Sequence, residues 1–355
     1  MFVYVGLIIF FVSSILFFRY KENKEKYKLL FLWVSGVLFI ILSSLRYKIG
    51  FDYSTYETLF YQIGNGTNKE NLEIGFLLLN KAVFFFRGDY RIFLFIVNTI
   101  MTVLVFWWIY RFSKFPEISV FFYFAFQFWA CSMNLLRQSI ALSIFLLSYQ
   151  SLLERNFIKY IIIVLIAASF HQSILIMIPF YFLLYQNITK LYLIIISILF
   201  VLGYVFFDFI VYGIFDILFS DYQKYIDTIY WNSNSISYII FPCIYLLFVL
   251  YHAKKLINDC EKNKILINSC IYGSFISFFI TKHFILERFS LYFFIFSLIL
   301  IPEIIFFDKK ASKKNIVFLF SIILGLSYFS FSAKEEFHNV YPYRSIFDRA
   351  ISSNK

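Results

Sequence analysis

The feature that most constrains this chain is a succession of apolar runs, many of them near the length of about 20 residues that an α-helix needs to cross a bilayer. Hydrophobic residues make up 61% of the 355 residues and charged residues only 15%. Ordinary soluble domains have about 45–50% and about 25%. Since a water-soluble globule cannot bury so much apolar surface, the sequence predicts a polytopic membrane protein. It excludes soluble hydrolases, dehydrogenases and proteins that bind nucleic acid.

Twelve apolar runs could each form a membrane-spanning helix. Several have only about 14–17 residues, near or below the lower limit of about 17, so we expect some helices to be short or broken, with exposed backbone that lines a wet cavity. The expected fold is therefore all-α, with about 10–12 transmembrane helices. The runs are 2–18, 29–45, 92–110, 118–133, 135–153, 157–170, 172–185, 191–213, 236–252, 265–280, 284–307 and 316–331.

The distribution of Lys and Arg predicts an orientation. Six short loops placed in the cytoplasm contain 18 of the 32 basic residues, as the positive-inside rule requires: 19–28, 111–117, 154–159, 186–190, 253–264 and 308–315. Residues 1–355 then form a single integral-membrane domain with both termini outside, two longer outer loops, 46–91 and 214–235, and an outer tail, 332–355. We expect no cleaved signal peptide, because the first apolar run precedes its basic residues. The stretch 73–86 must then lie along or dip into the outer face.

Charged side chains beside the apolar runs are the most informative residues, because Arg or Asp in the middle of a transmembrane helix costs about 2.5–3.5 kcal/mol on insertion scales. Arg137 has no acid within one helical turn, so its partner comes from another helix or from a ligand. A belt of interfacial Tyr, hydrogen bonds inside the bundle and a disordered tail are the structural alternatives for such residues. The candidates on the predicted outer side are Arg46, Asp52, Tyr56, Arg137, His171, Arg288, Tyr292 and Arg344.

Four arginines on one membrane face, with an acid and a histidine, predict a site for an anionic, lipid-linked ligand. One guanidinium group can bind two phosphate oxygens at once, and it stays charged at any physiological pH. If the ligand is a polyprenyl-diphosphate sugar, they would stabilise charge on the leaving diphosphate during glycosyl transfer. His171 or Asp52 would take the proton of the attacking hydroxyl.

Motifs for other chemistry are absent from the sequence. It has no HExxH, CxxC, Walker loop or GxGxxG motif, and its four cysteines lack the spacing of metal ligands. We therefore expect chemistry that needs neither a metal nor a cofactor.

Six short segments, taken in order, resemble the EpsG-like, Wzy-type polymerases of bacterial O-antigen and of capsular or exopolysaccharide. The likeness covers nearly the whole chain. The segments are Arg46 with Gly50, Asp52 and Tyr56; Glu73-Ile74-Gly75-Phe76; Arg137-Gln138-Ser139-Ile140-Ala141; Phe170-His171-Gln172-Ser173; Arg288-Phe289-Ser290-Leu291-Tyr292; and Pro342-Tyr343-Arg344.

The resemblance implies a membrane-embedded glycosyltransferase of GT-C-like architecture in the bacterial cytoplasmic membrane, with its active site on the periplasmic or extracytoplasmic face. Such enzymes transfer the growing glycan from undecaprenyl diphosphate to the non-reducing end of an undecaprenyl-diphosphate-linked repeat unit. A polysaccharide chain-length regulator would be a further partner. In this interpretation Arg46, Arg137, Arg288 and Arg344 hold diphosphates, and Glu73, Tyr56 and Tyr292 line the sugar cavity.

Two other functions would use a similar cationic cavity. A flippase or other transporter of the lipid-linked oligosaccharide should bring internal repeat symmetry, and an O-antigen ligase should bring one large outer loop. The sequence shows no internal repeat, and its longest predicted outer loop, 46–91, is modest. The sequence therefore favours the polymerase.

Overall fold

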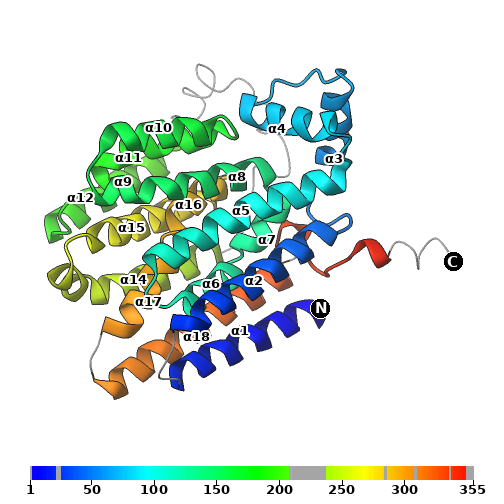
Figure 1. Ribbon diagram of the computed structural model, residues 1–355. Helices are drawn as coiled ribbons and strands as arrows, with labels where there is room; N and C mark the ends of the chain where they lie inside the picture. The colour runs from blue at the N-terminus through cyan, green and yellow to red at the C-terminus, as the bar shows by residue number, and fades with distance from the viewer. Residues whose placement is uncertain are drawn as a thin grey trace. The chain divides into compact units, whose positions relative to one another are not determined.

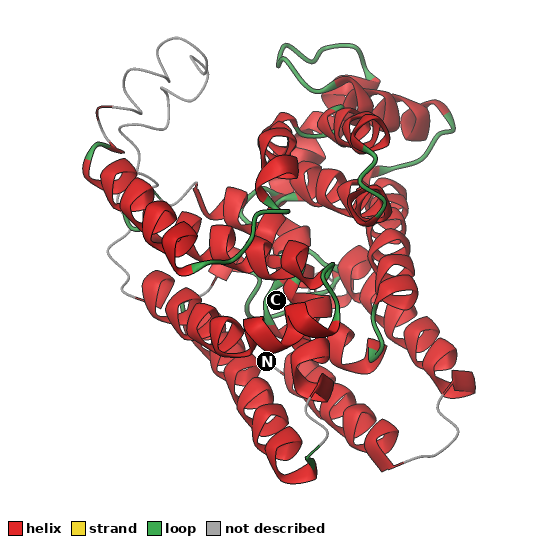
Figure 2. Cartoon of the chain, turned by 90° about the vertical axis from the view of Figure 1, so that its left-hand side faces the viewer, coloured by secondary structure: helices red, strands yellow, loops and turns green. Residues whose placement is uncertain are grey.

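The computed structural model describes residues 2–20, 25–207, 209, 237–283, 286–307, 310–335 and 337–348. Every regular element within these ranges is a helix (Figures 1 and 2), so the predicted all-α fold is confirmed. The chain divides into two compact units. Unit 1 comprises Met1–Ile178 and Ile301–Lys355, and unit 2 comprises Pro179–Leu300.

Unit 1 is built around α2, which packs along α5, and around α6, which contacts α1, α2 and α18. The pair α3 and α4 packs together, and α8 packs on both α5 and α10. Its elements are α1 (Phe2–Tyr20), α2 (Glu25–Leu45), α3 (Tyr53–Gly64), α4 (Ile74–Phe85), α5 (Tyr90–Phe112), α6 (Pro116–Ala125), α7 (Phe128–Asn134), α8 (Leu136–Phe145), η1 (Leu146–Ser148), α9 (Tyr149–Leu153), α10 (Phe157–Ala168), η2 (Gln172–Ile176), α18 (Ala311–Lys334) and η5 (Phe337–Asn339).

Unit 2 centres on α15 (Asn263–Phe279), which packs on α12 (Lys190–Val205), α14 (Ser237–Asp259) and α16 (Glu287–Phe294). Asn268 of α15 is fully buried, and its amide joins three groups: it donates to the carbonyls of Leu184 and Gln186 and accepts from the Tyr192 hydroxyl. Such hydrogen bonds hold membrane helices together. α11 (Met177–Leu183) and α17 (Ser297–Phe307) carry the chain between the units. The predicted loop 214–235 lies outside the described residues.

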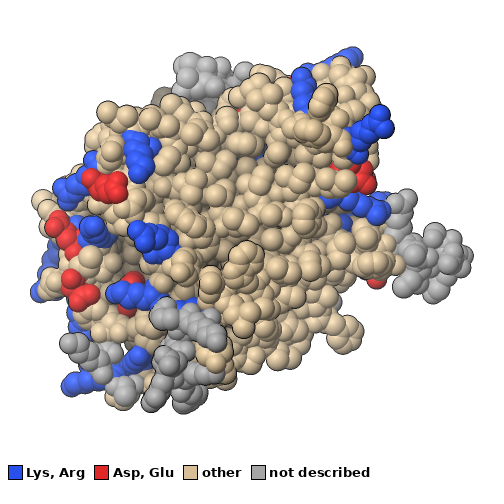
Figure 3. All heavy atoms as spheres, viewed as in Figure 1, with Lys and Arg blue, Asp and Glu red and all other residues tan. Residues whose placement is uncertain are grey.

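Four described helices contain a segment long and apolar enough to span a membrane: Tyr27–Leu45, Tyr90–Phe112, Ile239–Asp259 and Ser312–Lys334. A fifth span results if α16 and α17, bent by 44°, count as one. Each of the twelve predicted runs coincides with helical structure in its described residues, several as helices of fewer than 18 residues. Around the middle of α2 and α5 the surface carries almost no charge (Figure 3). The chain is a multi-pass membrane protein with short and broken helices.

The run 118–133, predicted as one segment, is broken in the structure. α6 ends at Ala125 and α7 begins at Phe128, because Gln127 adopts a left-handed conformation with φ 67°. The Gln127 side chain accepts a 2.6 Å hydrogen bond from the Tyr341 hydroxyl, a residue more than 200 positions away. A tertiary contact therefore accompanies this break, which local hydropathy does not reveal.

The described part of the predicted outer tail, up to residue 348, is bound to the ends of α1 and α2. Its backbone carbonyls at Asn339, Val340 and Arg344 accept hydrogen bonds from the N-terminal part of unit 1. The Tyr343 hydroxyl donates to the carbonyl of Leu42 at 2.8 Å. The donors to those three carbonyls are Gly50 N–H, the Tyr4 hydroxyl and Tyr47 N–H, at 3.0, 2.6 and 3.0 Å.

Two glycines with positive φ provide a matched test of this packing. Gly50 has φ +91°, and a Cβ there would lie 2.9 Å from the Met133 carbonyl oxygen; Gly66 has φ +72° with nothing within 4 Å. We expect Gly66→Ala to cost about 1–2 kcal/mol of unfolding free energy from backbone strain alone. Gly50→Ala should add about 1–3 kcal/mol from overpacking. Thermal unfolding of the purified protein in detergent measures the difference, and equal melting temperatures would contradict the close approach.

Candidate functional site

The carboxylate of Glu73 joins two residues that lie far away in the sequence. Its Oε2 accepts a 2.9 Å hydrogen bond from Nη1 of Arg137 in an ion pair, and its Oε1 lies 3.1 Å from Nδ1 of His171. The same Oε1 accepts the backbone N–H of Gln172 at 3.3 Å. The side chains of Glu73 and His171 are each 10% exposed and that of Arg137 is 28% exposed. This cluster of Glu73, Arg137 and His171 is the candidate site.

Helix ends bring the three residues together. Glu73 is the N-cap residue of α4, and Arg137 lies in the first turn of α8, directly after the break at Leu135. His171 is extended, with φ −160° and ψ 115°, between α10 and η2. Polar side chains at such breaks can face a shared cavity. In an unbroken transmembrane helix, the same positions would lie within the regular helix and not at its end.

Gly75 fixes the distance between α4 and the segment that carries His171. Its N–H donates a 2.7 Å hydrogen bond to the Ser169 carbonyl, and a Cβ at Gly75 would lie only 2.6 Å from Ser169 Oγ and 2.8 Å from that carbonyl oxygen. A larger residue would therefore displace the start of α4 and with it the Glu73 carboxylate.

The pKa of Glu73 is strongly perturbed. Burial by itself would raise the pKa of this carboxyl, but the hydrogen bond with His171 and the positive charge of Arg137 outweigh burial and lower the pKa from 4.5 to about 2. Glu73 is therefore ionised at any physiological pH, and an ionised carboxylate only accepts hydrogen bonds. The proton between the two groups consequently lies on Nδ1 of His171.

Tyr56 completes the group of predicted residues that the structure brings together. Its phenol is hydrogen-bonded to Arg137, and the Arg137 guanidinium lies 5.9 Å from the centre of the Phe76 ring. Tyr56 itself is buried in the apolar cluster that α3, α4 and α5 form with α8. Apolar side chains thus cover the ion pair of Glu73 and Arg137 on the side of α3.

Arg46 lies in a different environment. It follows the last residue of α2, is fully buried, and donates from Nη1 to the Ser43 carbonyl at 2.5 Å and from Nη2 to the Met133 carbonyl at 3.2 Å. Its backbone forms an isolated bridge with Ser345. Among the described residues no carboxylate forms an ion pair with Arg46. Its contacts therefore join main-chain segments, and its predicted binding of diphosphate stays a prediction.

Asp52 and Arg344, the other predicted residues of unit 1, have different hydrogen-bond partners. Asp52 is the N-cap residue of α3 and is half-buried; its N–H donates to Oδ1 of Asn134 at 3.0 Å. Arg344 is exposed, and its carbonyl binds Tyr47. Arg288 and Tyr292 lie one turn apart on α16, which belongs to unit 2.

Sequence reasoning missed Asn134 as a junction. Asn134 lies three residues before Arg137. Its Oδ1 accepts the Asp52 N–H and its Nδ2 lies 2.8 Å from Nδ1 of His338, so that Asn134 connects the start of α3 to the C-terminal segment. A buried amide between two apolar runs was the available signal.

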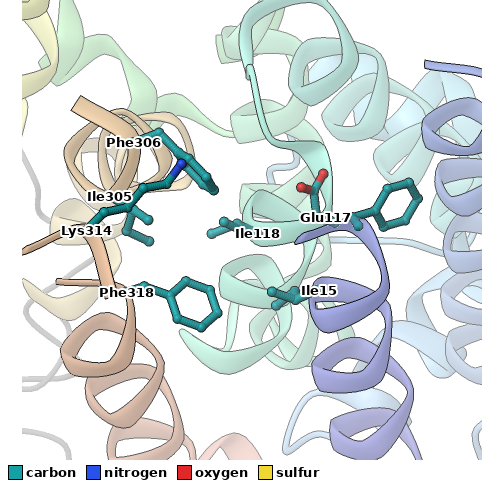
Figure 4. Close-up of a pocket in the computed structure, with 8 residues that line it drawn as sticks. Ile15, Glu117, Ile118, Ile305, Phe306, Lys314 and Phe318 are labelled. Carbon is teal, nitrogen blue, oxygen red and sulfur yellow. The ribbon is translucent and has the colours of Figure 1, made fainter. Parts of the chain in front are cut away.

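A pocket elsewhere in unit 1 contains none of the predicted site residues. It lies between α1, α6, α17 and α18, and Figure 4 shows Glu117 and Lys314 on opposite walls of it. The Lys314 ammonium lies 3.9 Å from the centre of the Phe306 ring. The remaining lining is apolar: Ile15, Phe18, Ile118, Ile305 and Phe318. Because Lys314 belongs to a predicted cytoplasmic loop, we do not assign this pocket to the candidate site.

A family model described as the EpsG family matches residues 29–345, nearly the whole chain. The chain belongs to the EpsG family. The match contains every residue of the Glu73 cluster, and it supports a membrane protein with a role of the glycan-polymerase type. No curated protein and no solved structure gives a significant match.

The lowered pKa of Glu73 predicts how stability depends on pH. A carboxylate whose pKa is lower in the folded state stabilises the fold above its unfolded pKa near 4.5, and this contribution is lost as pH falls towards 2. At about 1.36 kcal/mol per tenfold change in proton affinity, the contribution at pH 7 is on the order of 3 kcal/mol.

We therefore expect Glu73→Gln to lower the unfolding free energy by about that amount at pH 7, and by progressively less below pH 4.5. Denaturation of the detergent-solubilised protein across this pH range measures the difference. Glu70→Gln, at an exposed position of the same loop, is the control and should unfold like the wild type. A difference between Glu73→Gln and wild type that stays constant with pH would contradict the ionised pair.

Proposed function

We propose that this protein is a polysaccharide polymerase of the bacterial cytoplasmic membrane. It would transfer the growing O-antigen or capsule glycan from undecaprenyl diphosphate to the non-reducing end of an undecaprenyl-diphosphate-linked repeat unit, on the outer face of the membrane. Family membership and the multi-pass helical fold support this proposal. The observation that carries it is the Glu73 carboxylate, which holds a histidine and an arginine side by side.

His171 is the proposed base. With its proton held on Nδ1 by Glu73, the neutral imidazole has its lone pair on Nε2, the arrangement by which a carboxylate orients a catalytic histidine. Nε2 would accept the proton of the acceptor sugar hydroxyl as the hydroxyl oxygen bonds to the anomeric carbon of the donor. Asp52 is the alternative base. Its hydrogen bond to Asn134 involves the backbone N–H of Asp52 and not its carboxylate, so this bond does not orient the carboxylate as Glu73 orients His171.

Arg137 is the arginine best placed for the leaving group. Its guanidinium binds Glu73 and the Tyr56 phenol, and because the side chain is 28% exposed, its remaining terminal donors could bind a ligand. As the bond from the anomeric carbon to the diphosphate oxygen breaks, the negative charge that remains on the lipid diphosphate would be stabilised by the guanidinium. No metal is required for this step. Arg344 and Arg288 are proposed as further diphosphate ligands, and Tyr56 and Tyr292 as residues that line the sugar cavity.

The base assignment predicts a large loss of activity in His171→Ala. Purified protein in proteoliposomes with synthetic undecaprenyl-diphosphate repeat units should give a ladder of longer lipid-linked glycans, and we expect the variant to form it about 10²–10⁴-fold more slowly. Arg155→Gln, at an exposed position in a predicted cytoplasmic loop, should polymerise normally. A fully active His171→Ala protein would move the base to Asp52, and wild-type protein that only carries the substrate across the bilayer would indicate a transporter.

The leaving-group assignment predicts that Arg137→Ala leaves single repeat units on the lipid. Because this variant also removes the partner of Glu73, Arg137→Lys is the informative companion: it keeps the charge but loses the paired guanidinium donors. We expect partial activity in Arg137→Lys and no polymer in Arg137→Ala, measured by gel separation of the lipid-linked products. Normal chain length in Arg137→Ala, with normal melting in detergent, would contradict the diphosphate role.

A further inference from the structure

The two packed helices α3 and α4 expose opposite kinds of surface. The exposed positions of α3 include Thr55, Thr58 and Gln62, and its apolar residues are buried except for Tyr61, which is 43% exposed and carries a polar hydroxyl. The exposed positions of α4 include Ile74 and Leu78, which are 58% and 57% exposed. One helix of the pair thus presents a polar surface to its surroundings, and the other presents an apolar one.

The exposed apolar residues of α4 follow one side of the helix. Ile74, Leu78 and Phe85 recur at helical spacing, and Phe86 follows directly after the last residue of α4; the two phenylalanines are each 80% exposed, and we call these four residues the α4 apolar face. The opposite side, which includes Phe76 and Val83, packs into the core with α3 and α5. A row of four large apolar side chains would be unusual for a protein surface that faces water.

α4 is too short to span a membrane. Its 12 residues rise about 18 Å, against about 30 Å for the hydrocarbon core. A helix with one apolar face and flanking basic residues is typical of segments that lie in the plane of the lipid–water interface.

Basic side chains accompany the apolar face. Lys81 is exposed within the row of the α4 apolar face, between Leu78 and Phe85, from where its long side chain can extend to the lipid phosphates; Arg87 is exposed just after α4 and Arg91 is exposed at the start of α5. None of the three forms an ion pair with a described residue. Lys and Arg side chains gather around α3 and α4 on the surface (Figures 1 and 3). Cations at this position complement the phosphates of anionic lipids.

We propose that α4 is an interfacial helix. Its apolar face enters the upper acyl region of the outer leaflet, and Lys81, Arg87 and Arg91 bind the phosphates of anionic phospholipids, while α3 faces water. Since Glu73 is the N-cap residue of α4, the cluster of Glu73, Arg137 and His171 lies close to the depth of the lipid phosphates. This last step rests on the proposed function, whose substrate class is a lipid-linked diphosphate. In such a substrate the reacting bond would lie at the depth of the lipid phosphates.

The first test compares one environment-sensitive fluorescent label at two positions. The full-length protein with Cys243→Ser and Cys260→Ser retains only the buried cysteines 131 and 270, and it carries the label at Leu78→Cys or, as the control, at Thr58→Cys on α3. In vesicles of phosphatidylethanolamine and phosphatidylglycerol, we expect the label at 78 to be quenched by lipid with a nitroxide near the headgroup and to be protected from iodide. The label at 58 should show the reverse.

Three outcomes would overturn the proposal. Quenching of the label at 78 by iodide would place α4 in water. Stronger quenching by a nitroxide deep in the acyl chain would place α4 within the hydrocarbon core. Protection from iodide and from both nitroxide lipids would mean that another protein or a second copy of the chain covers this face.

The second test concerns the basic residues. We expect the label at 78 to be quenched more by nitroxide-labelled phosphatidylglycerol than by the matching phosphatidylcholine, and this preference to fall about fivefold for each charge removed by Lys81→Gln, Arg87→Gln and Arg91→Gln. Lys254→Gln with Lys255→Gln on α14 is the control and should keep the preference. Inorganic phosphate should not abolish the preference; if it does, or if the triple variant keeps it, the lipid-phosphate contact is wrong. Neither test requires polymerisation, so the results of both tests are independent of the proposed function.

Discussion

The ionised carboxylate of Glu73 is the group on which the candidate site of unit 1 depends. Arg137 lies in the first turn of α8, where the positive end of the helix dipole disfavours a cation, and it is mostly buried. A buried guanidinium needs an anion nearby. Glu73 supplies that anion from the N-terminus of α4, where a negative charge is favoured. The same carboxylate determines which nitrogen of His171 carries the proton, so one side chain sets both the charge and the hydrogen-bonding state of the cluster.

Breaks in the helices make this arrangement possible in a membrane protein. α7 ends at Asn134 and α10 at Ala168, so that the residues after them lie at helix ends. At the first break the Arg46 guanidinium donates to the Met133 carbonyl, and the Asn134 side chain binds the Asp52 N–H and the His338 ring. In lipid, exposed backbone is tolerated only where protein or a wet cavity satisfies it. The bound tail and the buried Arg46 therefore support the break from which Arg137 extends.

α4 combines two structural features in one short helix. Its N-terminus holds the acid of the candidate site, and its outer side is apolar where that of its neighbour α3 is polar. An enzyme that acts on a sugar attached to a membrane lipid must hold its reactive groups near the lipid phosphate. In the proposal made here, a short helix in the interface would accomplish this because its apolar face would set its depth, while the close contact at Gly75 ties the start of α4 to the segment that carries His171.

The sequence by itself determined the class of fold and most of the candidate residues. Apolar runs of membrane-spanning length predict helices because lipid leaves backbone groups no other partner. Charges beside these runs drew attention to Arg137 and His171 because such charges are costly. The resemblance added Glu73 and proposed it as a residue that lines the sugar cavity; its pairing with residues 64 and 98 positions away was not foreseen.

Tertiary structure alone decided which of these residues meet. Arg46 and Arg137 are both arginines beside apolar runs, yet one is enclosed by backbone carbonyls and the other pairs with a carboxylate. The break at Gln127 likewise accompanies a hydrogen bond from a residue near the other end of the chain. Hydropathy and helical period depend on neighbours within a few turns, whereas these pairings depend on how helices distant in sequence pack against one another.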